Sequence, residues 1–404
     1  MELLSPAGNL EKLKYAYSFG ADAAYMGISN FSLRSKAENL SSDEYAAIAG
    51  IKGNRKLYAA LNIYFHDQDI RSLEENLDYI SLYPFDAFII SDIGILPLLK
   101  KRFPSTPLHL STQANCVNSE AAKMYRDLGF SRIVPGRELS LREIEQVKRS
   151  VDIEVEVFVH GAMCLAYSGR CILSSYMSGR SANKGDCSHS CRWRYRVLEE
   201  EERRGEYYPV VEGENFTTIL SSKDLCMIDH LRELQSAGVD ALKIEGRMKS
   251  IYYTAIVTRA YRNALDQLDG TNTAEATSYR EELFNVSHRE LSTGFYFGRE
   301  KMEVSTRKSY MRGYDFLGII GIYVSEGTYS LDVKNQIRQD DELEYVGYDT
   351  LYICDRSFRL LDEMGGSLQK IDHGKAGFIR TDKPVKEGYL IRRKAYGSSG
   401  RPDR

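Results

Sequence analysis

The sequence predicts an α/β fold: a TIM-like (β/α)8 barrel followed by a small C-terminal β-barrel domain. The first observation is a recurring phrase, in which a turn residue and a polar or acidic residue precede a short apolar strand. It reads GADAAYMG, PFDAFIISD, GFSRIVPGR and GVDALKIEGR. The second observation is that an amphipathic helical stretch comes before each copy. A chain that alternates helix and strand in this way is typical of a barrel of parallel strands.

Further apolar segments between these copies bring the number of predicted strands to eight. The strand-bearing segments are 3–5, 20–27, 56–61, 84–92, 108–110, 129–137, 153–159 and 238–247. Eight strands in strict alternation with helices favour a closed barrel over an open, doubly wound sheet. No GxGxxG motif opens a helix after the first strand, so the dinucleotide-binding form of the open sheet lacks its main support.

The domain organisation follows from changes in pattern along the chain. We expect residues 1–300 to form the barrel, with a cysteine-rich loop over 160–195. The charged, turn-rich stretch at 199–216 is interpreted as an exposed excursion. Short alternating strands with Gly-bearing turns then predict the C-terminal β-barrel domain over 310–394. We expect the tail, 395–404, to be flexible.

Composition limits the class of protein. Hydrophobic residues make up 43% and charged residues 27% of the 404-residue chain, which is ordinary for a globular protein. No apolar run approaches the roughly 20 residues that span a bilayer, and the first residues lack a signal-peptide pattern. We therefore expect a cytoplasmic protein with no membrane contact, in which thiols stay reduced. The net charge of −3 argues against a wholly basic nucleic-acid-binding protein but permits a local basic face.

Four of the seven cysteines fall in one short stretch, in the spacing C-x6-C-x15-C-x3-C. They are Cys164, Cys171, Cys187 and Cys191. Unrelated buried cysteines would be scattered along the chain, so a shared metal or cluster is the best explanation. The stretch follows the strand at 153–159, and the loops after barrel strands form the mouth where catalytic groups lie. The sequence therefore predicts a thiol site at the mouth of the barrel.

Spacing alone leaves the identity of the ligand open. Zinc sites usually use close pairs of cysteines, and only Cys187 and Cys191 approach that spacing. An iron–sulfur cluster is therefore favoured, with zinc as the alternative and a catalytic thiol or coincidence as the remaining interpretations. Cys226 is a possible replacement ligand or, equally, a buried helix cysteine. His189 lies between two candidate ligands, although a solvated loop histidine is the simpler interpretation.

Charged residues near strand ends are candidates for catalysis and substrate binding. His160 ends a predicted strand, where it could act as an acid or base or have a structural role. Lys243 and Glu245 share one face of the last strand and should point into the barrel interior, where buried charges need partners. Guanidinium groups that could bind an anionic substrate, or could equally be surface residues or ion-pair partners, are those of Arg137, Arg170, Arg180 and Arg247.

A run of alternating cations and aromatics directly follows the last cysteine. It contains Arg192 and Arg194 and reads RWRYR, a combination suited to phosphate contact and base stacking. A strand with one exposed basic face is the simpler alternative. The C-terminal module adds basic residues at 392–394, and small β-barrels often bind RNA.

The segment EVFVHGAMCLAYSGRCILSSYMSGRSANKGDCSHSCRWRY closely resembles the signature of peptidase family U32, the collagenase-like proteases. The stretches SSKDLC, GVDALKIEGRMKSIYY and VKNQIRQDDELEY extend the resemblance over nearly the whole chain. Within the family, the chain looks most like the branch of prephenate-dependent tRNA hydroxylation, which makes 5-hydroxyuridine. Other branches act in rRNA hydroxylation and in oxygen-independent ubiquinone hydroxylation.

This resemblance implies a cofactor and a reaction. The cofactor would be a [4Fe–4S] cluster bound by the four cysteines of the loop, with Cys226 in contention because some relatives use a different fourth cysteine. The reaction would be a tRNA modification, hydroxylation at C5 of a wobble uridine with prephenate as co-substrate. Arg137 and Arg247 would hold the carboxylates of prephenate, while Arg192, Arg194 and the C-terminal module would engage the tRNA anticodon stem-loop. A protein partner of the same family is possible.

The resemblance to this family leaves two alternative functions, which are collagenase-like peptidase activity and rRNA hydroxylation. The residues give proteolysis little support, since the sequence has neither HExxH nor GxSxG. The one candidate dyad, His160 with Cys164, would place the nucleophile within the ligand set. A thiolate bound to iron is not free to attack a peptide bond.

Overall fold

The computed structural model describes residues 1–28, 31–32, 44–164, 167–171, 173–178, 180–184, 186–188, 190, 211–213, 216–218, 223–271, 276–298 and 311–395. The chain forms two compact units. The first comprises Met1–Ala274 with His288–Tyr310, and the second comprises Glu275–Ser287 with Met311–Arg404. The sequence places 275–287 in the barrel domain, whereas the structure groups this segment with the second unit.

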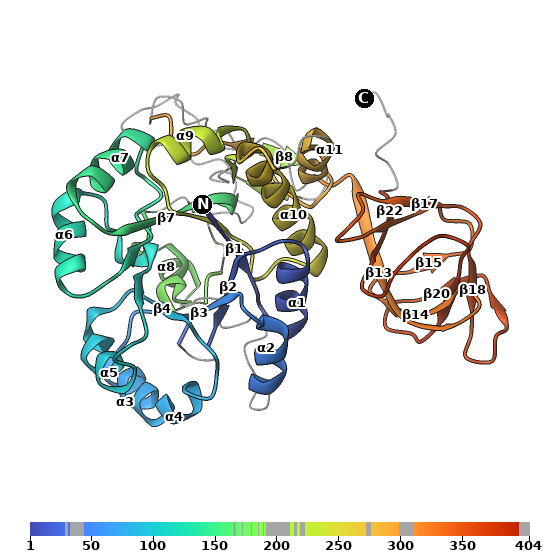
Figure 1. Ribbon diagram of the computed structural model, residues 1–404, viewed down its shortest axis with the longest axis horizontal. Coiled ribbons are helices and arrows are strands. Elements are labelled where there is room, and N and C mark those ends of the chain that lie inside the picture. The colour runs from blue at the N-terminus through green and yellow to red at the C-terminus, as the bar shows by residue number, and fades with distance from the viewer. Residues whose placement is uncertain are drawn as a thin grey trace. The chain divides into compact units, whose positions relative to one another are not determined.

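Eight parallel strands in the described part of the chain close the barrel of the first unit (Figure 1). They are β1(Glu2–Pro6), β2(Ala23–Gly27), β3(Lys56–Leu61), β4(Ala87–Ile90), β5(Leu108–Leu110), β6(Arg132–Ile133), β7(Glu154–Ala162) and β11(Ala241–Ile244). Each strand pairs in parallel with the next, and β11 pairs with both β1 and β7, which closes the ring. The predicted (β/α)8 barrel is therefore confirmed.

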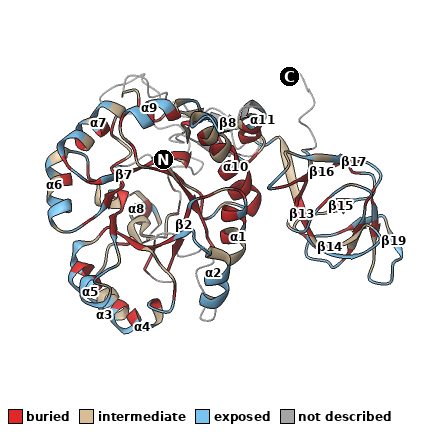
Figure 2. Ribbon diagram, in the orientation of Figure 1, coloured by how far each residue is buried: buried red, intermediate tan, exposed pale blue. Residues whose placement is uncertain are grey.

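Helices pack around the outside of this ring in Figure 1. They are α1(Leu10–Ser18), α2(Tyr45–Lys52), α3(Asp67–Glu75), α4(Leu77–Ile80), α5(Leu96–Arg102), α6(Ser119–Asp127), α7(Leu141–Ser150), α9(Leu231–Ser236) and α10(Ile251–Leu268), while α8(Leu173–Ser178) lies in the cysteine segment. Local sequence sets their starts: at α7, Ser140 N–H donates to Glu143 Oε2 at 2.7 Å in a capping box. Figure 2 shows exposed residues on the outer faces and buried ones toward the strands, as amphipathic helices on a barrel require.

Two short strands extend the sheet beside the end of β7. β10(Asp224–Cys226) pairs antiparallel with β7, and β12(Leu291–Ser292) pairs in parallel with β10. The buried pair of Asp224 and Arg289 holds them, since Arg289 Nη2 donates to Asp224 Oδ1 at 2.7 Å. Strands of two or three residues carry no readable period, so the sequence did not predict them.

The barrel interior holds charged as well as apolar side chains. Glu156 on β7 is fully buried and accepts hydrogen bonds from Lys243 Nζ at 2.7 Å and Arg132 Nη1 at 3.0 Å. Arg132 also donates to Glu2 Oε1 at 2.6 Å and to Glu154 Oε2 at 2.8 Å. Burial raises the pKa of Glu156, but the two cations outweigh this and lower it, so the carboxylate is ionised at neutral pH. The buried charges thus satisfy one another.

The second unit is built on an antiparallel sheet with the order β17-β16-β22-β13-β14-β21-β18-β19. Its strands are β13(Tyr314–Ser325), β14(Thr328–Val333), β16(Leu343–Val346), β17(Ile353–Asp355), β18(Arg359–Leu361), β19(Ser367–Leu368), β21(Phe378–Arg380) and β22(Leu390–Lys394). The unit also contains the pair β15(Ile337–Arg338) and β20(Lys370–Ile371) and the helix α11(Ala276–Glu281). The sheet curls into a half-barrel around an apolar core that includes Leu317, Tyr345, Phe358 and Ile379, which confirms the predicted C-terminal β-domain.

Arg392 on β22 is fully buried between two carboxylates. Its Nε donates to Glu344 Oε2 at 2.8 Å and its Nη2 to Glu282 Oε1 at 3.0 Å. The second ion pair explains why 275–287 belongs to this unit. Arg393 likewise pairs with a buried aspartate of the same unit. Both arginines therefore hold the domain together and do not serve as the RNA contacts that the sequence suggested, whereas Lys394 of the same run is exposed.

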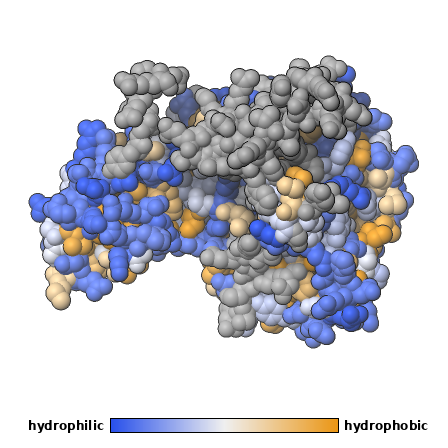
Figure 3. Space-filling model, turned by 180° about the vertical axis from the view of Figure 1, so that it is seen from behind, coloured by the Kyte–Doolittle hydropathy of each residue, from blue (hydrophilic) through white to orange (hydrophobic). Residues whose placement is uncertain are grey.

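The excursion predicted at 199–216 is described only in part. There, β8(Val211–Gly213) and β9(Phe216–Thr218) form a two-stranded antiparallel sheet. Figure 3 shows one face of the molecule, on which the described surface is mostly hydrophilic with scattered apolar side chains. Within the described ranges, no helix is both long enough and apolar enough to cross a membrane.

The variant Glu156→Ala tests whether the interior charges depend on one another. It removes the carboxylate that binds Lys243, so we expect the free energy of unfolding of the barrel unit to fall by about 3–5 kcal/mol. Glu154→Ala is the matched control, because Glu154 binds the same Arg132 with a side chain that is 52% exposed. The free energy of unfolding of Glu154→Ala should fall by no more than about 1 kcal/mol. Urea unfolding followed by circular dichroism compares the two, and equal losses would contradict the role assigned to Glu156.

Candidate functional site

The cysteine segment leaves the end of β7 and lies against loops that follow other barrel strands. The hydroxyl of Tyr64, after β3, donates to the carbonyl of Gly169 at 2.6 Å and to that of Gln113, after β5, at 3.1 Å. The backbone N–H of Tyr64 donates to the carbonyl of Asn183 at 3.2 Å. Because these loops leave the carboxyl ends of parallel strands, the segment lies at the mouth of the barrel, where active sites of this fold are found.

Residues 167–171 are the most closely held part of the segment. The N–H of Ser168 donates to Glu138 Oε1 at 2.5 Å, and Ser168 Oγ accepts from the N–H of Arg137 at 3.3 Å. Gly169 has a φ of +72°, and a Cβ there would lie 2.1 Å from a backbone oxygen of the loop after β5. Only glycine fits this position. Loops after three different strands therefore fix the backbone of this turn.

Polar contacts also hold the later part of the segment. Ser174 on α8 donates from its hydroxyl to the carbonyl of Arg180 at 2.7 Å. The guanidinium of Arg180 donates to Asp186 Oδ1 at 2.7 Å and to the carbonyl of Cys187 at 3.3 Å. Arg180, one of the sequence-based candidates for anion binding, therefore pairs within the segment and positions Cys187.

The thiols of the segment are accessible. Cys164 is exposed, and Cys171 and Cys187 are partly exposed. Cys191 lies outside the described residues. Within the described ranges, no group of three or more His, Cys, Asp or Glu side chains is arranged to hold a metal ion. The donor chemistry of three reduced thiols on one segment fits a thiolate-bound cluster or zinc, with the predicted fourth ligand in the part that is not described.

His160 and Cys226 lie opposite each other where β10 pairs with β7. Tyr261 on α10 contacts both, since its hydroxyl oxygen is 3.4 Å from His160 Nδ1 and 3.9 Å from Cys226 Sγ. His160 is 1% exposed, and burial lowers its pKa to about 3, so the ring is neutral at pH 7. In the described structure no hydrogen bond joins His160 to Cys164. The dyad that a cysteine peptidase needs is therefore not formed there.

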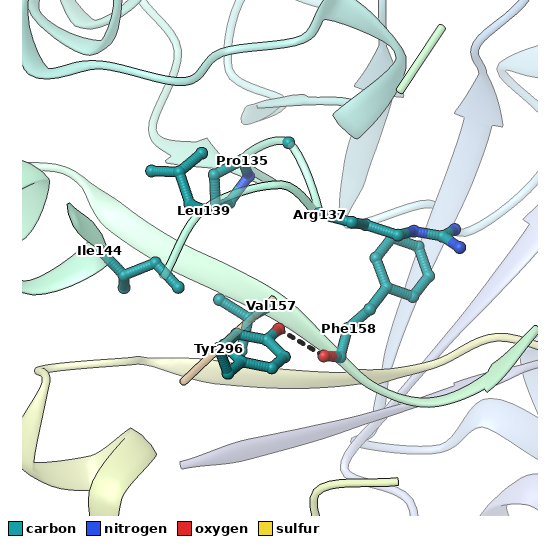
Figure 4. Close-up of a pocket in the computed structure, with 8 residues that line it drawn as sticks. Pro135, Arg137, Leu139, Ile144, Val157, Phe158 and Tyr296 are labelled. Carbon is teal, nitrogen blue, oxygen red and sulfur yellow. Dashed lines mark hydrogen bonds between the residues drawn. The ribbon is translucent and has the colours of Figure 1, made fainter. Parts of the chain in front are cut away.

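Arg137, after β6, is well placed to bind an anion at the mouth. Its guanidinium carbon lies 3.9 Å from the centre of the Phe158 ring, and Figure 4 shows the two groups stacked. Its Nη1 donates to the carbonyl of Ala162 at 2.8 Å, and its Nη2 is 3.7 Å from Glu245 Oε2. The buried Nε has no hydrogen-bond partner in the described structure. The guanidinium therefore keeps donor capacity for a ligand.

A small pocket lies on the other side of β7 from the barrel interior (Figure 4). Ile144 on α7 and Val157 on β7 line it, so it lies between the barrel and its outer helices. The hydroxyl of Tyr296 crosses it and donates to the carbonyl of Phe158 at 2.6 Å. No cysteine is among the residues that line this pocket.

Lys243 and Glu245 lie at different depths. Lys243 is buried in the interior and bound to Glu156; burial lowers its pKa, and the carboxylate opposes that shift. Glu245 lies just past β11 beside Arg137 and is partly exposed. The structure therefore brings Glu245 and Arg137 together at the mouth and places Lys243 below them.

The remaining arginines differ in their access to solvent. Arg247 is buried, and its Nη1 donates to Ser32 Oγ at 3.2 Å. Arg170 is exposed, and among the described residues its side chain makes no hydrogen bond or ion pair. Arg192 and Arg194 lie outside the described residues. Of these four candidates, Arg170 is the one that the structure describes as open to a ligand.

Sequence reasoning missed the residues that hold the cysteine segment in place. These are Tyr64, Ser168 and Gly169. A tyrosine just past a strand carries no pattern of its own. The dipeptide Ser-Gly in YSGR is a turn signal, and it could have indicated the special backbone of Gly169.

Tyr64→Phe tests the attachment of this segment. The variant loses a hydroxyl that binds two carbonyls, so we expect local opening to cost about 1–2 kcal/mol less and the amides of 167–171 to exchange about 5- to 30-fold faster. Tyr79→Phe is the control, because it removes a hydroxyl that lies 2.6 Å from that of Tyr83, away from the segment. Hydrogen–deuterium exchange with mass spectrometry measures both. Unchanged exchange at 167–171 in Tyr64→Phe would show that the hydroxyl does not hold the segment.

Comparison with known proteins agrees with this architecture. The family model for peptidase family U32 matches residues 8–306, and the model for the peptidase family U32 C-terminal domain matches residues 312–392. The tRNA hydroxylation protein P1 of Bacillus subtilis is 36% identical over 380 residues, which cover 92% of this chain and 89% of that protein.

Two other relatives carry different names. A 23S rRNA 5-hydroxycytidine synthase of Escherichia coli is 37% identical over 330 residues, which cover 81% of this chain and 48% of that longer protein. A collagenase of Porphyromonas gingivalis is 28% identical over 411 residues, which cover 96% of this chain and 95% of that protein. The barrel, the C-terminal half-barrel and these matches together show that the chain belongs to peptidase family U32.

Proposed function

We propose that this protein is a tRNA-modifying enzyme that hydroxylates C5 of a wobble uridine to give 5-hydroxyuridine. Two relatives, which match 92% and 81% of the chain, are named for the hydroxylation of RNA, and they support this class of reaction. The structural observation that carries the proposal is the set of solvent-accessible thiols at the barrel mouth. This arrangement suits a redox cofactor better than a hydrolytic nucleophile.

The proposed cofactor is a [4Fe–4S] cluster held by the four cysteines of the segment. Cys164, Cys171 and Cys187 are at least partly exposed, and Cys191 is the proposed fourth ligand by sequence. Cys226 is the alternative fourth ligand. It pairs with His160 near the end of β7, where the cysteine segment begins. Such a cluster would supply electron-transfer chemistry at the mouth. Structural or catalytic zinc is the alternative occupant of the same thiolates.

The proposed co-substrate is prephenate, whose two carboxylates suit Arg137 and Arg247. Arg137 keeps a buried, unpartnered Nε in the described structure, and its ion pair with Glu245 is long, at 3.7 Å. A carboxylate that approached this guanidinium would bind in a poorly solvated site, where electrostatic attraction is stronger than in water. Arg137 would thus orient the co-substrate beneath the thiol segment.

The proposed macromolecular partner is the anticodon stem-loop of tRNA. An enzyme that acts on a base needs that base unpaired, and the wobble position lies in a single-stranded loop. Arg170 offers a free cation at the mouth, and Arg192 and Arg194 are further phosphate contacts by sequence. We expect an enzyme that acts on tRNA to work in the cytoplasm. Assembly with a second protein of the family is compatible with this proposal.

Collagenase-like peptidase activity and rRNA hydroxylation remain the alternative functions. A peptidase would need a nucleophile beside a base, and the described His160 is buried, neutral and not bonded to Cys164. The rRNA-modifying relative is about twice as long as the matched region, so this chain spans only 48% of it. Transfer RNA therefore stays the preferred substrate.

Analysis of cellular tRNA tests the substrate. Deletion of the gene, in a strain without a redundant enzyme, should remove 5-hydroxyuridine and its derivatives from bulk tRNA. Complementation with Cys187→Ala should fail to restore them, whereas Cys354→Ala, which changes an exposed thiol in the second unit, should restore them fully. Mass spectrometry of tRNA nucleosides measures the result. Unchanged 5-hydroxyuridine derivatives in the deletion strain would overturn the tRNA assignment.

Iron and sulfide content tests the cofactor. Protein purified without oxygen should contain about four iron and four sulfide per chain. Cys171→Ala and Cys187→Ala should lose most of both, and the buried Cys116→Ala should lose neither. Comparison of Cys191→Ala with Cys226→Ala identifies the fourth ligand, because only the variant that lacks this ligand should lose iron. One equivalent of zinc without iron in the wild-type protein would contradict the cluster.

A further inference from the structure

We propose that Ser174 and Asn183 are positioning residues for the thiolate-bound cofactor, which join the backbones of Cys171 and Cys187 into one preorganised unit. This inference rests on the proposed function, because it assumes that these thiols bind a metal or a cluster. It goes beyond that proposal, since it assigns the placement of two ligands to polar side chains that are not themselves among the proposed ligands.

Asn183 connects Cys171, 12 residues earlier, to the barrel. Its side-chain Nδ2 donates to the carbonyl of Cys171 at 3.1 Å. Its own carbonyl accepts from the N–H of Tyr64, after β3, at 3.2 Å. At the next position, Lys184 Nζ donates to Asp69 Oδ2 of α3 at 2.8 Å. The turn that binds Cys171 is therefore itself held by two groups of the barrel.

Ser174 connects α8 to the turn that carries Cys187. It is 1% exposed, and its hydroxyl donates to the carbonyl of Arg180 at 2.7 Å and accepts from the N–H of Ser188 at 2.9 Å. Arg180 in turn donates from Nη2 to the carbonyl of Cys187 at 3.3 Å. A single buried hydroxyl thus fixes the backbone on both sides of Cys187.

These two sets of bonds overlap along the sequence. Ser174 follows Cys171 closely and binds next to Cys187, whereas Asn183 lies shortly before Cys187 and binds at Cys171. Each cysteine is thereby tied to the stretch that carries the other. All of these bonds join protein groups, so they can form before a cofactor binds.

Such support matters because metal ligands act only within narrow limits of geometry. Ligating groups need to be held within about 0.5 Å of their binding positions, and the residues around them do this. Cys171 and Cys187 are far apart in sequence, and a loop of that length without internal bonds would not hold two thiols to this limit. A preorganised pair of ligands also loses less conformational entropy when the cofactor binds.

The variants Ser174→Thr and Ser174→Val test the buried hydroxyl. They have the same shape, and only Ser174→Thr keeps a group that can bind the carbonyl of Arg180 and the N–H of Ser188. In Ser174→Val both backbone groups lose a buried partner, so the segment should open more often. Iron should then leave the anaerobically purified holoprotein about 5- to 150-fold faster than it leaves Ser174→Thr. Absorbance of the iron complex with an added chelator measures the rate.

Asn183→Ala tests the bond to Cys171. It removes this bond and leaves the backbone bond to Tyr64 in place. Iron loss should be about 2- to 12-fold faster than in wild type, as expected for one hydrogen bond. Asn76→Ala is the matched control, because its Nδ2 donates to the carbonyl of Ser72 of α3 at 2.7 Å, outside the cysteine segment. It should release iron at the wild-type rate.

A spectroscopic measurement separates positioning of the ligands from general stabilisation of the loop. The electron paramagnetic resonance spectrum of the reduced protein reports the geometry around the cluster. Its g values should differ between Ser174→Val and Ser174→Thr, and between Asn183→Ala and Asn76→Ala. Faster iron loss with unchanged g values would assign both residues to loop stability alone and overturn the inference.

The outcomes distinguish this inference from the proposed function. A full cluster with the same iron release and the same spectrum in all four variants would overturn the inference and leave the cofactor proposal standing. Zinc in place of iron would overturn the cluster, and the inference would then stand only if a zinc chelator gave the same order of release rates. Wild-type protein that binds neither metal would overturn both.

Discussion

The buried ionic cluster inside the barrel is the constraint on which the rest of the structure depends. Glu156 joins Lys243 of β11 to Arg132 of β6, and so links the closing strand of the ring to the strand on the far side of β7. Charges taken out of water are tolerated only when each has a close partner. The cluster therefore requires one register of β7 against its two neighbours, and a shift by one residue would turn Glu156 away from both cations.

That register decides what the mouth of the barrel presents. Two residues beyond Glu156, Phe158 faces the same side of β7 and packs between the cations of Lys243 and Arg137, 5.6 Å and 3.9 Å from its ring centre. The strand then runs into the cysteine segment. This segment is held by hydrogen bonds from loops such as the one that carries Tyr64. The thiols are thus held over a rigid barrel by a set of local polar contacts.

The parts of this architecture that follow local rules could be predicted from the sequence. The barrel strands are apolar runs bounded by turn residues, and the cysteine segment directly follows one of them, which places it at the mouth. Contacts between distant residues could not be predicted. Arg392 looked like an exposed basic residue, but its partner Glu282 lies 110 residues away and buries it. The hydrogen bond from Tyr64 to Gly169 is of the same kind, since no periodicity links a hydroxyl to a backbone carbonyl 105 residues away.

The enzyme that we propose would hold a small dicarboxylate at Arg137 and a cofactor on the thiols of the cysteine segment, and would act on an unpaired base. The most direct test is the reaction itself. Anaerobically purified protein with its cofactor is incubated with an anticodon stem-loop RNA, with and without prephenate, and the RNA is analysed by mass spectrometry. The account predicts 5-hydroxyuridine at the wobble position only when prephenate is present. An unmodified wobble uridine in the complete mixture, with the cofactor intact, would contradict it.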